Sequence, residues 1–174
     1  SNVLSMSSMF EGAHNFDEDI GNWDVGKVTD MRWMFSCARN FHGDLSRWDV
    51  SNVRNMHGMF NDGGEIWGDI SNWDVSKVTD MSGMFGYMFG GFDQDLSRWD
   101  VSNVTNMASM FENTKYVGDI RAWNVSNVTN MKYMFCKRRK FYDDDEWFYS
   151  ETVESIAEEP RTDDFNQDLS GWDV

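Results

Sequence analysis

The sequence repeats itself about every 25 residues, and this period constrains the fold more than any other feature of the chain. The 174 residues divide into seven units of 24 to 26 residues. A unit this short cannot bury its apolar side chains alone and must do so against its neighbours in a stack. Residues 1–174 are therefore expected to form a single solenoid array. Neither end carries a polar cap unit, so the array is interpreted as an uncapped fragment of a longer chain.

Each unit places the same residue types at the same positions, which we call columns. The opening column is aromatic or Ile, and it is followed three residues later by Asp, then by Trp, by two Val and by two Met columns. Twelve of the 13 methionines fall in the two Met columns, which indicates flexible gap-fillers in a core rather than a metal site. The opening column consists of Phe16, Phe41, Ile66, Phe92, Tyr116, Phe141 and Phe165.

The spacing within a unit predicts both regular elements. Apolar residues over 51–60 fall on one face of a helix, with Ser51 as its N-cap. Residues 44–50 carry Leu45, Trp48 and Val50, which is typical of a short strand. The predicted fold class is an α/β repeat, a right-handed solenoid of about seven coils, each with a short helix, a loop and a short parallel strand.

Two kinds of unit alternate along the chain. Lys27 and Lys77 are followed three residues later by Asp, whereas the unit after each of them carries Asn at both positions. Within a helix, a Lys and an Asp three residues apart can form an ion pair. We therefore expect Lys27 to pair with Asp30, and the intervening Asn residues to separate like charges on successive coils.

Charge and composition exclude several classes of function. The chain has 30 acidic against 15 basic residues and a net charge of -15, which would repel nucleic acid. It has no apolar run long enough to span a membrane. Cys37 and Cys136 lie four units apart and are expected to be unpaired thiols. No nucleophile, metal or phosphate-loop motif is present, so we expect neither enzymatic activity nor a cofactor.

Two segments carry a family resemblance, Trp99 to Phe111 and Phe165 to Val174. They resemble the bacterial surface-protein repeat of about 25 residues found in BspA-like and mycoplasma lipoprotein families. The resemblance implies a leucine-rich-repeat-like solenoid, display at the cell surface or outside the cell, and a role in adhesion or host contact. It brings no catalytic residues.

The Asp column is the first candidate site. These carboxylates would repel one another across successive coils unless each accepts hydrogen bonds or shares a cation. They are interpreted either as acceptors of backbone N–H groups in turns or as a calcium ladder. The calcium candidates are Asp44, Asp69, Asp95 and Asp119.

The sixth unit, residues 141–164, is the second candidate site because it is irregular and strongly acidic. It is interpreted either as a decayed, solvated coil or as a protrusion that docks a partner or binds cations. The candidate partner-binding residues are Lys137, Arg138, Arg139, Lys140, Asp143, Asp144, Asp145 and Glu146.

Two functions remain open on these grounds. The first is a non-enzymatic surface-displayed binding or adhesion module, which uses one face of the array to bind a protein or a cell-surface ligand. The alternative is a structural scaffold or an assembly subunit within a larger complex.

Overall fold

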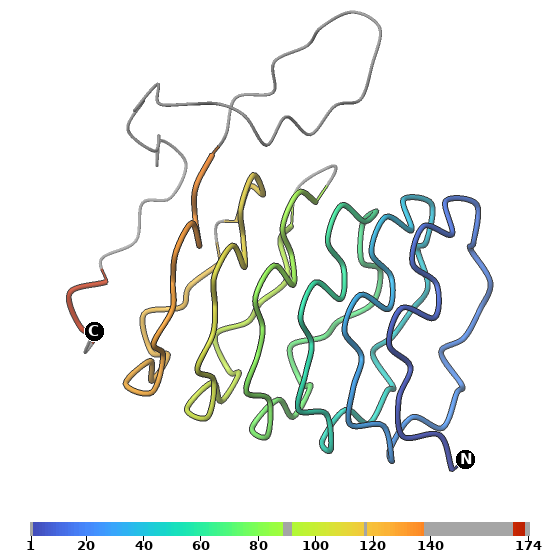
Figure 1. The fold of residues 1–174 in the computed structure, drawn as a ribbon, viewed down its shortest axis with the longest axis horizontal. Helices are drawn as coiled ribbons and strands as arrows, with labels where there is room; N and C mark the ends of the chain where they lie inside the picture. The colour runs from blue at the N-terminus through green and yellow to red at the C-terminus, as the bar shows by residue number, and fades with distance from the viewer. Residues whose placement is uncertain (1, 89–91, 117, 138–168, 173–174) are drawn as a thin grey trace, which may run out of the picture.

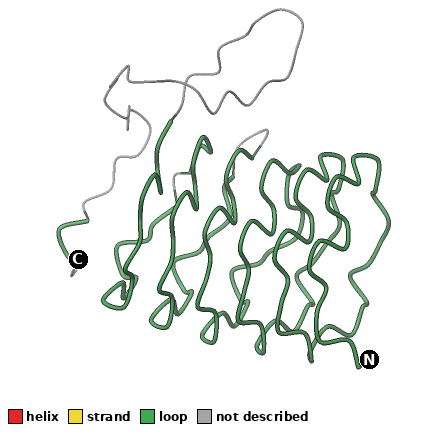
Figure 2. Ribbon diagram, viewed as in Figure 1, coloured by secondary structure: helices red, strands yellow, loops and turns green. Residues whose placement is uncertain are grey.

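The described part of the chain forms a row of flat coils that lie side by side (Figure 1). The structure is a computed structural model, and it describes residues 2–88, 92–116, 118–137 and 169–172. Throughout these residues the coils consist of turns and extended segments, with no helix and no strand longer than a single bridge (Figure 2). The expected α/β, leucine-rich-repeat-like solenoid is therefore wrong in its elements. The described part of the chain also contains no helix that could cross a membrane.

The segment predicted to be a helix is a run of overlapping turns. Three turns follow one another, closed by N–H groups of Met59, Asn61 and Gly63 that donate to carbonyls three residues earlier, at 3.1, 3.0 and 3.0 Å. The amides between them donate instead to the next coil. They are the N–H groups of Met56, Gly58, Phe60 and Asp62, which donate to the carbonyls of Asp80, Ser82, Met84 and Gly86 at 2.8 to 3.0 Å.

Left-handed residues explain why this segment is not helical. Gly58 has a φ of 60° and Asp62 a φ of 53°, and a positive φ recurs at these two columns in other coils. A positive φ at the third residue is the mark of a type II turn, and it turns the chain out of the right-handed helix. The local i to i+3 spacing of Met56 and Met59 is common to both structures, so the sequence pattern alone did not distinguish them.

The segment predicted to be a strand, residues 44–50, contains a turn. The N–H of Trp48 donates to the carbonyl of Leu45 at 3.1 Å, and a second turn follows from Val50 to Val53. Parallel pairing does occur, but as isolated bridges elsewhere in the coil. These bridges are Ser5 to Asp30, Asp30 to Asn55, Asn55 to Asp80, Asp80 to Asn106, Asn106 to Asn130, and Phe92 to Tyr116.

The buried ladders predicted from the columns are confirmed. In the second to fifth coils the Met, Val and Trp columns are all buried. Phe35, Phe60, Phe85 and Phe111 of these coils stack on one another with ring centroids 5.6 to 5.9 Å apart. The first coil differs, since Met9 and Trp23 are exposed there. Burial of these large side chains supplies the main stabilisation of so polar a chain.

Each buried tryptophan also fastens its coil to the preceding one. The indole N–H of Trp48 donates to the carbonyl of Ile20 at 3.1 Å, and Trp73, Trp99 and Trp123 repeat this bond with the coil before theirs. Trp172 makes the same bond to Ile120, at 3.3 Å. The tryptophan of the seventh unit therefore docks on the fifth unit, so the simple succession of seven coils expected from the sequence is corrected at this point.

The alternation of Lys and Asn has a different cause from the one expected. Lys27 donates to the side chain of Asn2 at 3.1 Å, in the preceding coil, while Asp30 pairs with Arg32 at 2.8 Å. Asn52, in the next coil, donates through its amide to the carbonyl of Gly26 at 2.8 Å. The predicted ion pair within a helix is wrong, and the two residue types hold successive coils together.

Candidate functional site

One column on the surface of the stack changes its residue from coil to coil. It directly follows the opening column and, in the described part of the chain, consists of Asp17, His42, Trp67 and Asp93, which we call the outer column. The opening residues themselves point inward and pack in or against the core. Because chain neighbours in extended backbone point to opposite sides, burial of the opening column places the outer column toward solvent.

Trp67 is the most exposed aromatic residue of the described part of the chain, at 57 % of its full accessible area. The imidazole ring of His42 lies beside it, with ring centroids 4.8 Å apart and planes inclined by 47°. Asp17 holds His42 from the other side, since its Oδ1 accepts the His42 backbone N–H at 2.9 Å and lies 3.6 Å from Nδ1. No residue that the structure describes hydrogen-bonds to the Trp67 indole N–H, which leaves this donor available to a ligand.

Gly68 brings a carboxylate up to this tryptophan. Its φ is 89°, and a Cβ atom at this position would collide with Asp44 Oδ1. Only glycine tolerates both the backbone angle and this close approach. The absence of a side chain therefore allows the carboxylate of Asp44 to lie against the backbone next to Trp67.

The five described carboxylates of the Asp column, which we call the carboxylate column, cap turns. In each coil Oδ1 accepts the backbone N–H two residues later, at 2.8 to 3.0 Å. This is the Asx-turn interpretation of the column, and it is confirmed. The five residues are Asp19, Asp44, Asp69, Asp95 and Asp119.

Hydrogen bonds from serine lower the pKa of three of these carboxylates. The hydroxyl and the backbone N–H of Ser46 hold the pKa of Asp44 below its usual value, and Ser71 and Ser97 do the same for the pKa of Asp69 and of Asp95. The four calcium candidates share one column, but among the described residues no three His, Cys, Asp or Glu side chains gather in a way that could hold a metal ion. The geometry of the described residues therefore provides no ligand set that would support the predicted calcium sites.

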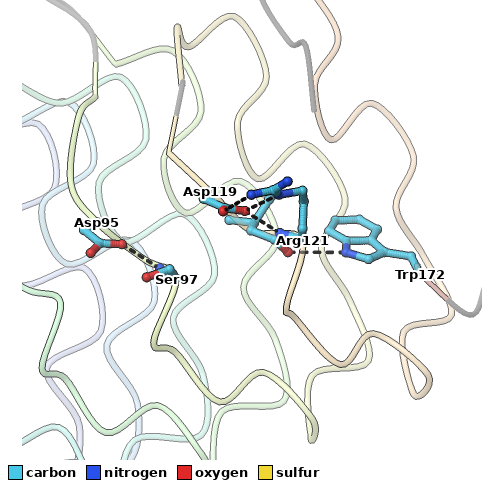
Figure 3. A network of polar contacts seen from close by, with 6 residues as sticks. Asp95, Ser97, Asp119, Arg121 and Trp172 are labelled. Atoms are coloured by element: carbon cyan, nitrogen blue, oxygen red, sulfur yellow. Dashed lines mark hydrogen bonds and ion pairs between the residues drawn. The ribbon is translucent and has the colours of Figure 1, made fainter. Parts of the chain in front are cut away.

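Asp119 differs from its column neighbours because its carboxylate is paired with Arg121 (Figure 3). Arg121 donates from Nε to Oδ1 at 3.0 Å and from Nη2 to Oδ2 at 2.7 Å. This pairing, with the Arg121 backbone N–H, lowers the pKa of Asp119 to about 2. The same view shows the Trp172 ring beside this pair, at the end of the stack where it docks on the fifth unit.

Most of the partner-binding residues predicted from the sixth unit lie outside the described residues. Lys137 is described and half-buried. Arg138, Arg139, Lys140, Asp143, Asp144, Asp145 and Glu146 fall in the range 138–168, outside the described part of the chain. Their role as a docking protrusion stays a prediction.

One cluster resembles a hydrolytic triad in its composition. Ser82 Oγ donates to Asp80 Oδ1 at 2.6 Å, and His57 Nδ1 lies 2.6 Å from Ser82 Oγ and 2.9 Å from the Ser82 carbonyl oxygen. The carbonyl can only accept, so Nδ1 carries the proton and cannot take one from the serine. Ser82 is buried as well, and these three residues therefore hold coils together rather than activate a nucleophile.

The two cysteines are free thiols, as expected for residues four units apart. Cys37 Sγ lies 3.6 Å from Asp62 Oδ2, which also accepts a hydrogen bond from Arg39 at 2.5 Å. Burial is the main cause that raises the pKa of the Cys37 thiol, and the negative charge of Asp62 adds to it. A thiol shifted in this direction is a poor nucleophile at neutral pH.

Sequence reasoning missed the pair of His42 and Trp67. The signal for this pair lies along the outer column. There, an exposed tryptophan lies between His42 and Asp93, at a position that the described coils otherwise fill with Asp or His. A large apolar side chain at a position that the repeat leaves in solvent is the signal that could have identified the site.

Comparison with known proteins places the chain in a family without assigning it a task. The model of a family described as "Mycoplasma protein of unknown function, DUF285" matches residues 1–88 and 64–172. No curated protein matches the chain. No solved structure matches it either.

Proposed function

This chain belongs to the Mycoplasma family of unknown function DUF285, and from that premise we propose that it is a non-enzymatic binding module displayed at the cell surface. The finer resemblance to BspA-like surface repeats supports display and adhesion as the setting. The observation that carries the proposal is the outer column, where an exposed tryptophan stands on an otherwise repetitive frame. Exposed aromatic residues of this kind are enriched where proteins bind partners.

The frame itself suits a binding role. Backbone and side-chain hydrogen bonds between successive coils fix the spacing of the surface columns, so a ligand meets a rigid array of groups. Rigid presentation reduces the entropy lost when a ligand binds. Residues of the outer column can change without disturbing these bonds, which allows one frame to present different surfaces.

Attachment of coated beads to cells tests the proposal. Beads that carry the whole chain are expected to attach to a monolayer of cultured animal cells more than albumin-coated beads do, and soluble chain should compete. Trp67→Ala should reduce attachment. Leu4→Ala is the matched control, because Leu4 is also an exposed apolar residue but lies on the first coil.

The same assay separates the alternatives. If beads with the whole chain attach no better than albumin-coated beads, adhesion is wrong and the scaffold prediction remains. Replacement of residues 141–164 by a copy of 116–140 tests the acidic unit. If that replacement abolishes attachment and Trp67→Ala does not, the binding site lies in the acidic unit and its basic preface rather than on the outer column.

A further inference from the structure

We propose that Trp67 and the carboxylates around it form a docking site for a basic segment of a partner protein, with a lysine or arginine side chain lying over the indole ring. The inference rests on the proposed function, since it names the chemistry of the partner for that same surface. It is carried by the geometry of Trp67 together with the charge of the three segments stacked at this point.

The indole ring of Trp67 is held in place on one side. His42 contacts it from the preceding coil, and Asp17 fixes His42 in turn, so the ring has a defined neighbour on one side. The exposed remainder of the ring is open to a ligand. Tryptophan offers the most favourable aromatic face to a cation, because its ring quadrupole presents negative charge above the plane.

The segments stacked at this position carry only negative formal charge. Residues 42–44, 65–69 and 93–95 contain five carboxylates and neither lysine nor arginine. They are joined directly, since Gln94 donates to the carbonyl of Ile66 at 3.2 Å and accepts the N–H of Ile70 at 3.2 Å, while Asp44 lies against Gly68. The carboxylates are Asp44, Glu65, Asp69, Asp93 and Asp95.

The negative charge around Trp67 favours a basic ligand. A cation over Trp67 can pair with Asp44 while the remaining carboxylates attract neighbouring basic residues of the same segment. The net charge of -15 also steers a basic partner toward the chain and repels an acidic one. Two arginines of this chain act on these carboxylates and lie in the following turns, Arg47 on Asp44 and Arg98 on Asp69 and Asp95.

Titration with short labelled peptides tests the inference. The whole chain is titrated into fluorescein-labelled oligoarginine, oligolysine and oligoglutamate, and fluorescence anisotropy reports binding at low ionic strength. The two basic peptides should bind and oligoglutamate should not. Trp67→Ala should weaken binding of the basic peptides about three-fold, and Trp67→Phe should weaken it less, because phenylalanine keeps a smaller aromatic face.

Two aspartates provide a matched pair for the charge. Asp44→Asn and Asp49→Asn each remove one negative charge, and each side chain caps a turn through the N–H two residues later, at 2.9 and 3.1 Å. Asparagine retains the accepting oxygen, so both variants should fold. Asp44→Asn should weaken binding about two-fold at low salt. Asp49→Asn should weaken it less, and added salt should remove the difference between them.

The outcomes that overturn the inference are specific. Equal losses in Asp44→Asn and Asp49→Asn, with Trp67→Ala unchanged, would show diffuse attraction of a polycation to an acidic protein. Trp67-dependent binding of a neutral oligosaccharide without binding of the basic peptides would assign the ring to a sugar. If the peptides do not bind but bead attachment still requires Trp67, the basic partner is wrong while the proposed function stands.

Discussion

The buried columns and the outer column of the same coils obey opposite rules. Inside, Met56, Met81 and Met107 are identical and fully buried in one hydrophobic core. Outside, the same coils carry His42, Trp67 and Asp93 at one equivalent position. A change inside alters two interfaces at once, whereas a change outside alters only what the surface presents. Repetition in this chain therefore indicates structure, and departure from repetition on the surface indicates function.

The bond that the tryptophan column makes between coils recurs at the seventh unit. Trp123 and Trp172 each donate to a carbonyl of the coil on which they dock, at 2.9 and 3.3 Å. They are 49 residues apart, about twice the usual separation. The tryptophan bond is therefore made at this longer sequence separation as well.

The largest expected effect is that of a charge placed in a buried column. Met84→Asp would place a carboxylate where the side chain is 0 % exposed, and it should cost about 4 kcal/mol or more in the free energy of unfolding. Met9 belongs to the same column but is 51 % exposed, so Met9→Asp should cost less than about 1 kcal/mol. Urea unfolding followed by circular dichroism measures both. Similar losses in the two variants would contradict the assignment of this column to the core.

The next effect concerns the tryptophan that fastens one coil to another. Trp99→Phe removes the indole N–H that donates to Ile70 at 3.1 Å and leaves a small cavity. The carbonyl still accepts the N–H of Trp73, so the expected cost is moderate, about 1–3 kcal/mol.

Trp23→Phe is the control for this substitution. Trp23 is in the same column but is partly exposed on the first coil, and its indole N–H has no acceptor among the described residues. It should cost less than about 1 kcal/mol in the same urea titration. A Trp23→Phe variant as unstable as Trp99→Phe would show that the bond between coils does not decide the effect.

Much of the core could be predicted from the sequence, because position in a repeat reports burial directly. The Met, Val and Trp columns were assigned to the interior from their recurrence alone, and the turn-capping role of residues such as Asp69 followed from the chemistry of Asp. Both inferences depend only on which residue types recur. Neither requires knowledge of the backbone angles.

The secondary structure could not be predicted in the same way. The spacing of Met56, Met59 and Phe60 suits one face of a helix and equally suits a run of turns. What decides between them is the destination of the N–H groups of Gly58 and Asp62, which donate to the next coil. These hydrogen bonds between coils require a left-handed backbone angle. Trp33 and Tyr87 adopt this angle in other coils, although neither residue type indicates it in a sequence.

The candidate site was missed for a related reason. Trp67 is conspicuous only once the opening column is known to point inward, since the same residue in a buried column would be unremarkable. The contact with His42 joins residues 25 positions apart and follows from the stacking register. The binding site was instead predicted in the sixth unit, because the acidic composition of that unit differs from the rest of the chain.

A smaller effect is expected from acid, and its sign follows from the lowered pKa values of the carboxylate column. Asp44, Asp69 and Asp95 have folded-state pKa values below the unfolded value of about 3.9. Their contribution to stability is therefore complete above about pH 4 and is lost as the pH falls through the folded-state values. The urea midpoint of the native chain should decline over that range.

The triple variant Asp44→Asn, Asp69→Asn and Asp95→Asn isolates this contribution, because asparagine keeps the turn-capping oxygen and cannot titrate. The difference in urea midpoint between the native chain and this variant should shrink below about pH 4. A difference that stays constant from neutral pH to about pH 2 would show that these carboxylates do not carry the acid sensitivity.

The smallest effect on stability is expected where the effect on binding is largest. Trp67→Ala removes a side chain that is 57 % exposed and whose ring contact is with the surface residue His42. Its free energy of unfolding should change by less than about 0.5 kcal/mol, as is usual for surface substitutions. Thermal unfolding measured alongside the peptide titration checks this. If Trp67→Ala lowered stability as much as Trp99→Phe does, the outer column would be part of the frame, and the weaker binding of that variant would report loss of fold instead of loss of a binding surface.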